Sequence, residues 1–284
     1  MKILVTGVKG QLGYDLCRIL SDRGIEHLGA DIEDFDITDA KATEAFITAY
    51  HPDAIIHCSA YTAVDRAEDD VELCTRVNAE GPANIAAVAK QLGAKMMYIS
   101  TDYVFPGTGE TAYSPEDPTG PLSVYGKTKL KGEEAVRAAS DRHFIVRISW
   151  VFGINGNNFV KTMLRLAETR TDLNVVADQI GSPTYTYDLS RLLCDMIVTD
   201  KFGTYHATNE GLCSWAEFAA EIMRLGGKST AIHPIPTAEY PTRAVRPLNS
   251  RMSKDKLEEN GFCRLPHWKD ALARYLDELN QAQG

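Results

Sequence analysis

The sequence predicts an α/β protein built on a doubly wound parallel sheet, with a smaller C-terminal lobe. Short apolar, β-branched runs alternate with amphipathic helical patterns over the first half of the chain. A glycine-rich segment joins the first run to the first helix, whereas the second half loses this alternation. We therefore expect a core over residues 1–150 and a lobe over residues 151–284, with a late strand near 203–207 returning to the core.

Three kinds of signal define the elements of the first half. Apolar residues in the first helix recur at the spacing of one buried face. Pro52 and Gly93 each follow a helical pattern closely and suit its end. The run Ala54–Ser59 is apolar, as in a strand buried on both faces. The expected elements are, in order, strand Lys2–Thr6, helix Gly10–Asp22, strand Glu26–Asp31, helix Asp39–Tyr50, strand Ala54–Ser59, helix Val71–Leu92, strand Lys95–Ser100 and strand Phe144–Trp150.

The segment Phe105–Pro121 interrupts this rhythm, because glycines and prolines are scattered through it among acidic residues. A loop of that length is often functional. Further on, Ser214 and Glu217 have the spacing of a capping box at the start of a helix. The expected elements of the second half are helix Asn158–Glu168, strand Gly203–Ala207, helix Ser214–Leu225, the extended, proline-rich segment Ile232–Asn249, and the terminal amphipathic helix Trp268–Gln281.

The composition disfavours several function classes. The formal net charge of −9 disfavours nucleic-acid binding, which needs basic surface to neutralise phosphates. The 6 cysteines form no C-x-x-C pair and no cluster with zinc spacing, so we expect free thiols and no metal site. No apolar run is long enough to cross a membrane, and the N-terminus begins a strand pattern rather than a signal peptide. The expected location is the cytoplasm.

The segment from Thr6 to Gly13 has the character of a dinucleotide-binding turn. Gly7, Gly10 and Gly13 follow the first strand and open the first helix, where glycines let backbone N–H groups approach a pyrophosphate. Asp31 ends the next strand, at the place where a carboxylate binds the adenosine ribose. Its charge would repel a 2′-phosphate. This context predicts a Rossmann core and favours NADH; the alternative is a glycine turn without a ligand and a surface aspartate.

Tyr125 and Lys129 are spaced by one helical turn, so one face of a helix presents both side chains. A ketone that receives hydride must also gain a proton, which a phenol can donate. A nearby ammonium favours the phenolate, so we expect the pKa of Tyr125 to be lowered. Thr101 follows a strand and can hydrogen-bond a substrate carbonyl. The alternatives are a structural i,i+4 pair and a plain turn of Ser, Thr and Asp.

The glycine spacing G-x-x-G-x-x-G, with Tyr125 and Lys129, resembles the extended short-chain dehydrogenase/reductase family. Within it, several segments are similar to the dTDP-4-dehydrorhamnose reductase family. The resemblance implies an oxidoreductase that uses NADPH or NADH to reduce the 4-keto group of dTDP-4-dehydro-6-deoxy-L-mannose. The product is dTDP-L-rhamnose, a precursor of cell-surface polysaccharide, and Tyr125 is the implied proton donor. The segments are Ser100–Gly107, Pro121–Lys129, Gly156–Phe159 with Lys161–Met163, Asp178–Thr184 and Arg246–Ser250.

The same resemblance implies roles for individual residues. Catalysis falls on Thr101, Tyr125 and Lys129, and Thr101 is favoured because the family's catalytic hydroxyl directly precedes this aspartate. Sugar-nucleotide contacts fall on Thr101, Asp102 and Trp150, whose indole either packs on the sugar or fills the core. The cofactor-binding residues are expected to be Gly7, Gly10, Gln11, Leu12, Gly13, Asp31, Asp36, Ile37, Ala60, Tyr61, Thr62, Tyr125 and Lys129.

Some expectations stay open between two outcomes. The family usually takes NADPH, whereas Asp31 favours NADH, so we expect use of both. Some family members are associated with magnesium, although no acidic cluster in this sequence indicates a metal site. Asn78 orders a water or the helix backbone, or is a plain surface residue. Arg243, Arg246 and Arg251 bind the sugar-nucleotide diphosphate, or are solvated surface residues.

Two other functions compete with the reductase. A dehydratase or epimerase can use the same fold, but dehydratases of this group have Thr-Asp-Glu where this chain has Thr101, Asp102 and Tyr103. A phenol is a poor base for β-elimination. A non-catalytic regulatory partner of another enzyme could lose Tyr125 or Lys129, yet this chain retains both. The expected partner is a dTDP-sugar, with no nucleic acid or membrane, and the expected state is a monomer or homodimer.

Overall fold

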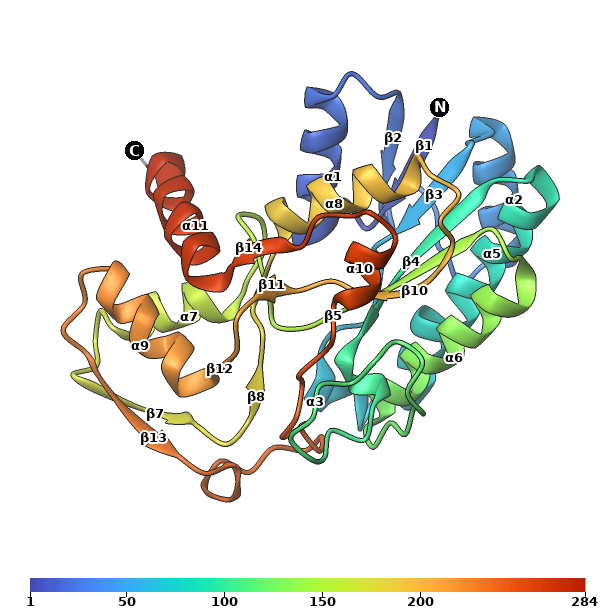
Figure 1. Ribbon diagram of the computed structural model, residues 1–284. Helices are drawn as coiled ribbons and strands as arrows, with labels where there is room; N and C mark the ends of the chain where they lie inside the picture. The colour runs from blue at the N-terminus through green and yellow to red at the C-terminus, as the bar shows by residue number, and fades with distance from the viewer. Residues whose placement is uncertain (284) are drawn as a thin grey trace.

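The computed structural model describes residues 1–283, and its centre is a six-stranded parallel sheet (Figure 1). The strand order is β10-β5-β4-β3-β1-β2, and each pairing in the sheet is parallel. This confirms the predicted doubly wound α/β class. The strands are β1 (Ile3–Thr6), β2 (His27–Ala30), β3 (Ala54–His57), β4 (Lys95–Thr101), β5 (His143–Ile148) and β10 (Gly203–His206).

Helices cover both faces of this sheet (Figure 1). Ile3 and Val5 of β1 pack into the core beneath one helical layer, whereas Leu4 between them packs into the core on the opposite face. Successive side chains of a strand point to opposite faces, so a strand covered on both sides must be apolar throughout. The first layer contains α1 (Gln11–Asp22) and α8 (Thr186–Ile197), and the second contains α2 (Ala40–Tyr50), α5 (Gly81–Leu92) and α6 (Val124–Ala139).

The strand order reverses between β1 and β3. From β1 the chain first adds β2 on one side, and β3 then pairs with β1 on the other. In doubly wound sheets the connecting segments diverge at such a point and leave a crevice outside the carboxyl ends of the strands. Thr6 and His57 are the last residues of β1 and β3, so the segments that follow them are the expected walls of a binding site.

The single helix predicted over Val71–Leu92 is wrong in one respect, because a π turn interrupts it. The structure has α4 (Val71–Thr75), the π turn Arg76–Glu80 and then α5. Pro82 has no N–H to donate to the Asn78 carbonyl one turn earlier. The buried Tyr98 hydroxyl donates to that carbonyl instead, at 3.1 Å. Turns of this kind often occur at functional sites.

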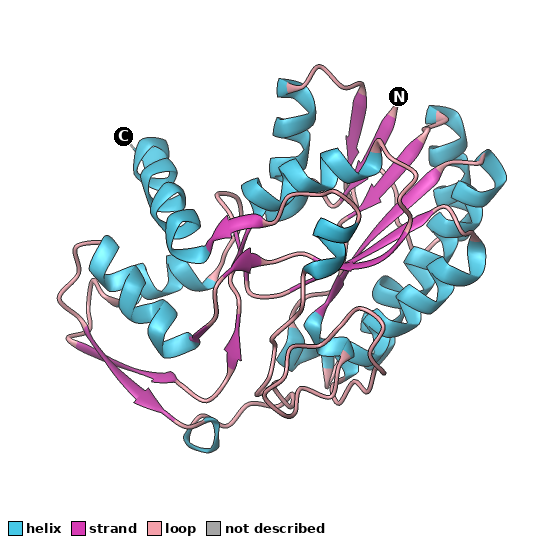
Figure 2. Ribbon diagram, viewed as in Figure 1, coloured by secondary structure: helices cyan, strands magenta, loops and turns pink. Residues whose placement is uncertain are grey.

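The second half of the chain forms a lobe beside the sheet (Figure 2). It has a hydrophobic core of its own, in which Phe152, Phe218 and Tyr275 are fully buried. Ser214 caps α9 by accepting the Glu217 N–H, and the predicted capping box is present. Gly284, the last residue of the predicted lobe, lies outside the described residues, and the division at residue 150 stays a prediction. The lobe contains α7 (Phe159–Leu166), α9 (Trp215–Leu225), α11 (Trp268–Gln283), β7 (Asp172–Val176) and β13 (Ala231–Ile235).

Several elements were not predicted, for physical reasons. Helix α8 was not predicted although Leu189, Leu192, Leu193 and Met196 follow helical spacing; its first turn, by contrast, buries the polar residues Thr186 and Asp188. Asp188 is paired with Arg274 of α11, which only the folded structure reveals. The segment expected to be extended from residue 232 contains a helical turn as well as β13. The other elements are too short for a periodic signal: α3 (Val64–Ala67), α10 (Asp255–Glu259), β6 (Val151–Phe152), β8 (Ile180–Gly181), β9 (Thr184–Tyr185), β11 (Asn209–Glu210), β12 (Cys213–Ser214), β14 (Leu265–His267) and the 3-10 turns Asp102–Val104 and Thr237–Glu239.

A buried ion pair fixes α6 against the sheet. The Glu133 carboxylate accepts two hydrogen bonds from Arg147 of β5, each 2.8 Å long, and one from Ser100 of β4. Burial alone raises the pKa of Glu133, but the Arg147 guanidinium reverses this effect and holds it below its ordinary value. Because Lys129 lies one turn before Glu133 on α6, this pair also sets where Lys129 stands relative to β4.

We expect Glu133→Gln to lower the free energy of unfolding by about 3–5 kcal/mol, because it leaves the Arg147 charge buried without its partner. Urea denaturation measures this loss. The matched control is Glu221→Gln, since the Arg224 partner of Glu221 is exposed and can be solvated. The control should leave the unfolding free energy nearly unchanged, and equal losses in the two variants would contradict the assigned importance of burial.

Candidate active site

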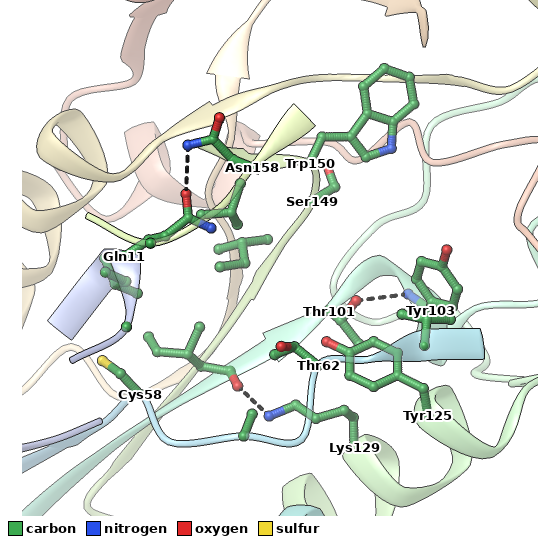
Figure 3. A pocket seen from close by; sticks show the side chains of 18 of the residues that line it. Gln11, Cys58, Thr62, Thr101, Tyr103, Tyr125, Lys129, Ser149, Trp150 and Asn158 are labelled. Atoms are coloured by element: carbon green, nitrogen blue, oxygen red, sulfur yellow. Dashed lines mark hydrogen bonds between the residues drawn. The ribbon is translucent and has the colours of Figure 1, made fainter. Parts of the chain in front are cut away.

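A cleft of about 1100 Å³ opens at the carboxyl end of the sheet, between the core and the second lobe. Its core side is formed by the segments that follow β1, β3 and β4 and by the start of α6. Its other side is formed by residues of α7, β7 and α9 and by the segment from Tyr240 to Ser250. Figure 3 shows that Thr101, Tyr125 and Lys129 gather on the core side, with Trp150 across the cleft from them.

At two positions of the glycine turn, Gly7 and Gly13, only glycine fits. Gly7 has φ +73°, and a Cβ on it would lie 2.7 Å from the Ser59 nitrogen. A Cβ on Gly13 would lie 2.3 Å from the Gly7 carbonyl oxygen. Gly10 caps α1 without a side-chain acceptor, so N–H groups of the first helical turn remain for a ligand. The predicted residues Gly7, Gly10, Gln11, Leu12 and Gly13 all line the cleft.

Asp31 lines the same part of the cleft and is tied to the glycine turn. Its carboxylate accepts the N–H of Lys9 at 2.8 Å and that of Ile32 at 2.9 Å. The Lys9 ammonium pairs with Glu33 at 2.5 Å rather than with Asp31. The carboxylates of Asp31, Glu33 and Asp34 therefore surround a single lysine, which leaves this end of the cleft acidic.

Most of the remaining residues predicted to bind a cofactor also line the cleft, but Tyr61 does not. The Tyr61 hydroxyl donates to Asp70, away from the cleft. The Tyr61 backbone is held by Asn78, whose amide accepts the Tyr61 N–H at 2.8 Å and donates to its carbonyl at 3.1 Å. Asn78 is thus fully buried and orders a loop, so the surface alternative is wrong. The residues that do line the cleft are Asp36, Ile37, Ala60 and Thr62.

Close approach of α6 to the loop after β4 brings the catalytic candidates together. Ser123 caps α6 by accepting the Gly126 N–H, and a Cβ on Gly126 would lie 2.2 Å from the Tyr103 carbonyl oxygen. The Tyr125 phenol therefore lies beside the side chain of Thr101 (Figure 3). One turn later, the Lys129 ammonium donates to the Ile99 carbonyl at 2.7 Å.

The expected lowering of the Tyr125 pKa is wrong for this structure. Burial raises the pKa of the Tyr125 phenol well above its ordinary value, although the neighbouring Thr101 side chain opposes the rise. Burial also lowers the pKa of the Lys129 ammonium, to about 7. Desolvation is the largest cause of both shifts, and the ammonium is directed to the Ile99 carbonyl. Burial therefore favours the protonated form of this phenol.

Asp102 and Trp150 join the core to the second lobe. Burial raises the pKa of Asp102 to about 6, against hydrogen bonds from Ser250 and Thr101. Trp150 has φ +50°, a backbone conformation that is strained for such a residue. Its half-buried indole stacks on Trp215 with ring centroids 3.8 Å apart and lines the cleft. Trp150 is therefore a wall of the cleft rather than core filling.

Of the three arginines considered for diphosphate binding, only Arg246 lines the cleft. Its guanidinium pairs with Asp65 and donates to the Tyr103 hydroxyl at 3.2 Å. Arg243 pairs with Asp69 at the exposed surface, and Arg251 donates to Asn249 at 3.0 Å. The structure therefore brings one of the three to the site.

Sequence reasoning assigned no role to several residues that shape the cleft. Asn158 caps α7, and its amide donates to Gln11 of the glycine turn at 3.1 Å, as Figure 3 shows. Gln179 and Ser250 also line the cleft. These three residues lie in segments that carry the family resemblance, so the sequence marked the segments but not the part that each residue plays in the cleft. Trp215 had no such signal, because it stands simply as the first residue after a helix cap.

The described residues include neither a metal-binding cluster nor a membrane-spanning helix. Over residues 1–283, no group of three or more His, Cys, Asp and Glu side chains is arranged to hold a metal ion. Across the same residues, no helix is both long enough and apolar enough to span a membrane.

Comparison with known proteins identifies one family over nearly the whole chain. The family described as RmlD substrate binding domain matches residues 1–281. The spore coat polysaccharide biosynthesis protein SpsK of Bacillus subtilis is 42% identical over 281 residues, with 99% of each chain covered. A dTDP-4-dehydrorhamnose reductase of Sinorhizobium fredii is 41% identical over 285 residues, with 96% of each chain covered.

Solved structures agree with this assignment. A dTDP-4-dehydrorhamnose reductase from Clostridium acetobutylicum superposes with a TM-score of 0.97 at 42% identity, covering 99% of this chain and 100% of that one. The enzyme of the same name from Bacillus anthracis, solved in complex with NADP, gives a TM-score of 0.95 at 40% identity, covering 98% of this chain and 99% of that one.

Proposed function

The chain belongs to the RmlD substrate binding domain family, and from this premise we propose that it is an NAD(P)H-dependent oxidoreductase that reduces dTDP-4-dehydro-6-deoxy-L-mannose to dTDP-L-rhamnose. The observation that carries the proposal is the convergence of Thr101, Tyr125 and Lys129 at the carboxyl end of the sheet. A cytoplasmic location and a monomeric or homodimeric state stay predictions. Neither the described side chains nor the names of the relatives support magnesium.

The residues present fit a dinucleotide. Gly7 and Gly13 permit the tight turn, because a Cβ at either position would collide with neighbouring backbone. That turn leaves the uncapped N–H groups at the start of α1 free to approach a pyrophosphate. The residues that would hold the cofactor are those of the glycine turn, with Asp31 at the adenosine ribose and Lys129 at the nicotinamide ribose. When bound, the reduced nicotinamide supplies a hydride to C4 of the sugar.

The side chains of this chain supply the proton and orient the carbonyl. Thr101 turns its hydroxyl proton from Asp102 to the C4 oxygen and holds that oxygen beside the phenol, where it stabilises the charge that develops. Tyr125 then donates its proton to that oxygen, so that the ketone becomes an alcohol and the phenol a phenolate. Lys129 stabilises the phenolate until a proton returns from solvent.

Residues on the walls of the cleft around Tyr125 orient the substrate. Asp102 and Trp150 bind the sugar, the first through its carboxyl group and the second through its indole face. Arg246 binds the diphosphate, because it is the candidate arginine that lines the cleft. The excess of acidic residues elsewhere makes this local charge necessary.

The structure weakens the dehydratase alternative. A dehydratase needs a base where this chain has Tyr103. Burial raises the pKa of Tyr103 to about 12, although Arg246 opposes the rise. The ring of Tyr103 packs edge-on against that of Tyr125, with centroids 5.4 Å apart. Tyr103 is therefore a wall of the site and a poor proton acceptor.

A spectrophotometric assay tests the proposal directly. We expect oxidation of NADPH or NADH that depends on added dTDP-4-dehydro-6-deoxy-L-mannose and yields dTDP-L-rhamnose. Chromatography of the product separates reduction from epimerisation, since an epimerase consumes no net cofactor. Absence of cofactor oxidation by folded protein that binds the sugar nucleotide would favour the regulatory-subunit alternative.

We expect Tyr125→Phe to lower kcat by about 10² to 10⁴, because the variant loses the proton donor while the ring remains. Cofactor affinity, measured by quenching of tryptophan fluorescence, should be retained. Tyr113→Phe is a suitable control, since it removes a phenol that hydrogen-bonds a loop outside the cleft. Wild-type turnover by Tyr125→Phe would rule out its assigned role.

We expect Asp31→Ala to weaken NADH binding more than NADPH binding, because the carboxylate that binds ribose hydroxyls repels a 2′-phosphate. Titration of each reduced cofactor measures the two dissociation constants. Glu26→Ala removes the same charge outside the cleft and should change neither dissociation constant. Equal losses for both cofactors in Asp31→Ala would contradict the ribose assignment.

A further inference from the structure

The Lys129 ammonium lies in an interior site where an aromatic ring is its close neighbour. Its nitrogen lies 4.1 Å from the ring centroid of Tyr98, on β4, and both residues are buried. The carboxylate nearest along α6, Glu133, is already bound by Arg147 and Arg137. The ammonium is therefore compensated by the Ile99 carbonyl and by the negative face of the Tyr98 ring.

The hydroxyl of Tyr98 makes a second set of contacts, with the backbone that carries the site. Its one proton is shared between the Asn78 carbonyl, at 3.1 Å, and the Lys129 carbonyl, at 3.4 Å. The Asn78 carbonyl is available because Pro82 has no N–H to give it. A Cβ on Gly132 would lie 2.3 Å from this hydroxyl, so α6 can approach Tyr98 only with glycine there.

We propose that Tyr98 is a positioning residue for the reaction: its ring face holds the Lys129 ammonium, and its hydroxyl joins the π turn to the helix turn that carries Lys129. This inference rests on the proposed function in one respect, the need for Lys129 as a cation. Tyr98 itself does not line the cleft, so it acts on the chemistry through Lys129.

The charge that the ring stabilises sets the direction of the expected effect. The neutral amine has no comparable attraction to the ring, so the ring favours the protonated form of Lys129. Weakening the ring face lowers the pKa of Lys129, and the ammonium is then lost at lower pH. His57 stacks on the same ring, and burial lowers its pKa to about 3, so it adds no competing positive charge. The titratable groups around Lys129 are Tyr98, Tyr125, Glu133, Cys58, Cys74 and His57.

Replacement of Tyr98 by Phe and then by 4-fluoro-, 3,5-difluoro- and 3,4,5-trifluoro-Phe tests the ring. These rings fill nearly the same space, but fluorine progressively removes the negative charge of the face. We expect the Lys129 pKa to fall stepwise across the series, by about one pH unit at the trifluoro ring. NMR titration of 13C-labelled lysine measures it, with the Lys129 signal assigned by its loss in Lys129→Arg.

A second readout uses the reductase activity. The basic limb of the kcat/KM pH profile should move to lower pH in the same order. The matched control introduces the same residues at Tyr205, a buried tyrosine of β10 that hydrogen-bonds Lys201 and lies outside the cleft. That control should shift neither the Lys129 signal nor the basic limb.

The two proposals fail in distinguishable ways. A Lys129 pKa that stays constant across the fluorinated series in folded protein overturns the role of Tyr98, whatever the activity. If the Lys129 pKa follows the series in a protein with no reductase activity, the Tyr98 contact stands and the proposed function falls. If the signal shifts while the basic limb stays in place, Tyr98 holds the ammonium but does not position it for the reaction, and the proposal is overturned.

Discussion

The site depends on one constraint: a lysine ammonium must stay inside the protein, beside a phenol, with no free carboxylate to neutralise it. Lys129 is buried, and Glu133 is engaged by two arginines. A carboxylate paired directly with Lys129 would neutralise the cation that, in the proposed mechanism, stabilises the Tyr125 phenolate. A backbone carbonyl and an aromatic face hold the ammonium more weakly, and they leave its charge available to the reaction.

The buried position of Lys129 also depends on glycines, at places where α6 lies too close to its neighbours for any side chain. Gly126 lets α6 reach the loop after β4, and Gly132 lets the same helix reach the Tyr98 hydroxyl. Gly7 and Gly13 do the equivalent at the turn after β1. The Glu133–Arg147 pair then locks α6 in register against β4 and β5. The catalytic helix and the glycine turn thereby face each other across the carboxyl end of the sheet.

The sequence allowed prediction of what depends on local pattern. The parallel sheet, the glycine turn and the Tyr125–Lys129 spacing are legible because strand alternation and helix periodicity repeat along the chain. The direction of the Tyr61 side chain, the π turn and the raised pKa of Tyr125 depend on burial and on partners distant in sequence. Tyr98 gave no sign of its role, because an aromatic residue in an apolar strand is also typical of ordinary core packing.

In the proposed reaction the Tyr125 phenol and the Thr101 hydroxyl act together on the C4 oxygen of the sugar. A crystal structure with oxidised cofactor and dTDP-L-rhamnose measures this most directly. We expect both hydroxyl groups within hydrogen-bonding distance of the sugar O4, and the Lys129 ammonium at the nicotinamide ribose. A complex in which O4 faces away from Tyr125, with the phenol bonded to another part of the ligand, would contradict it.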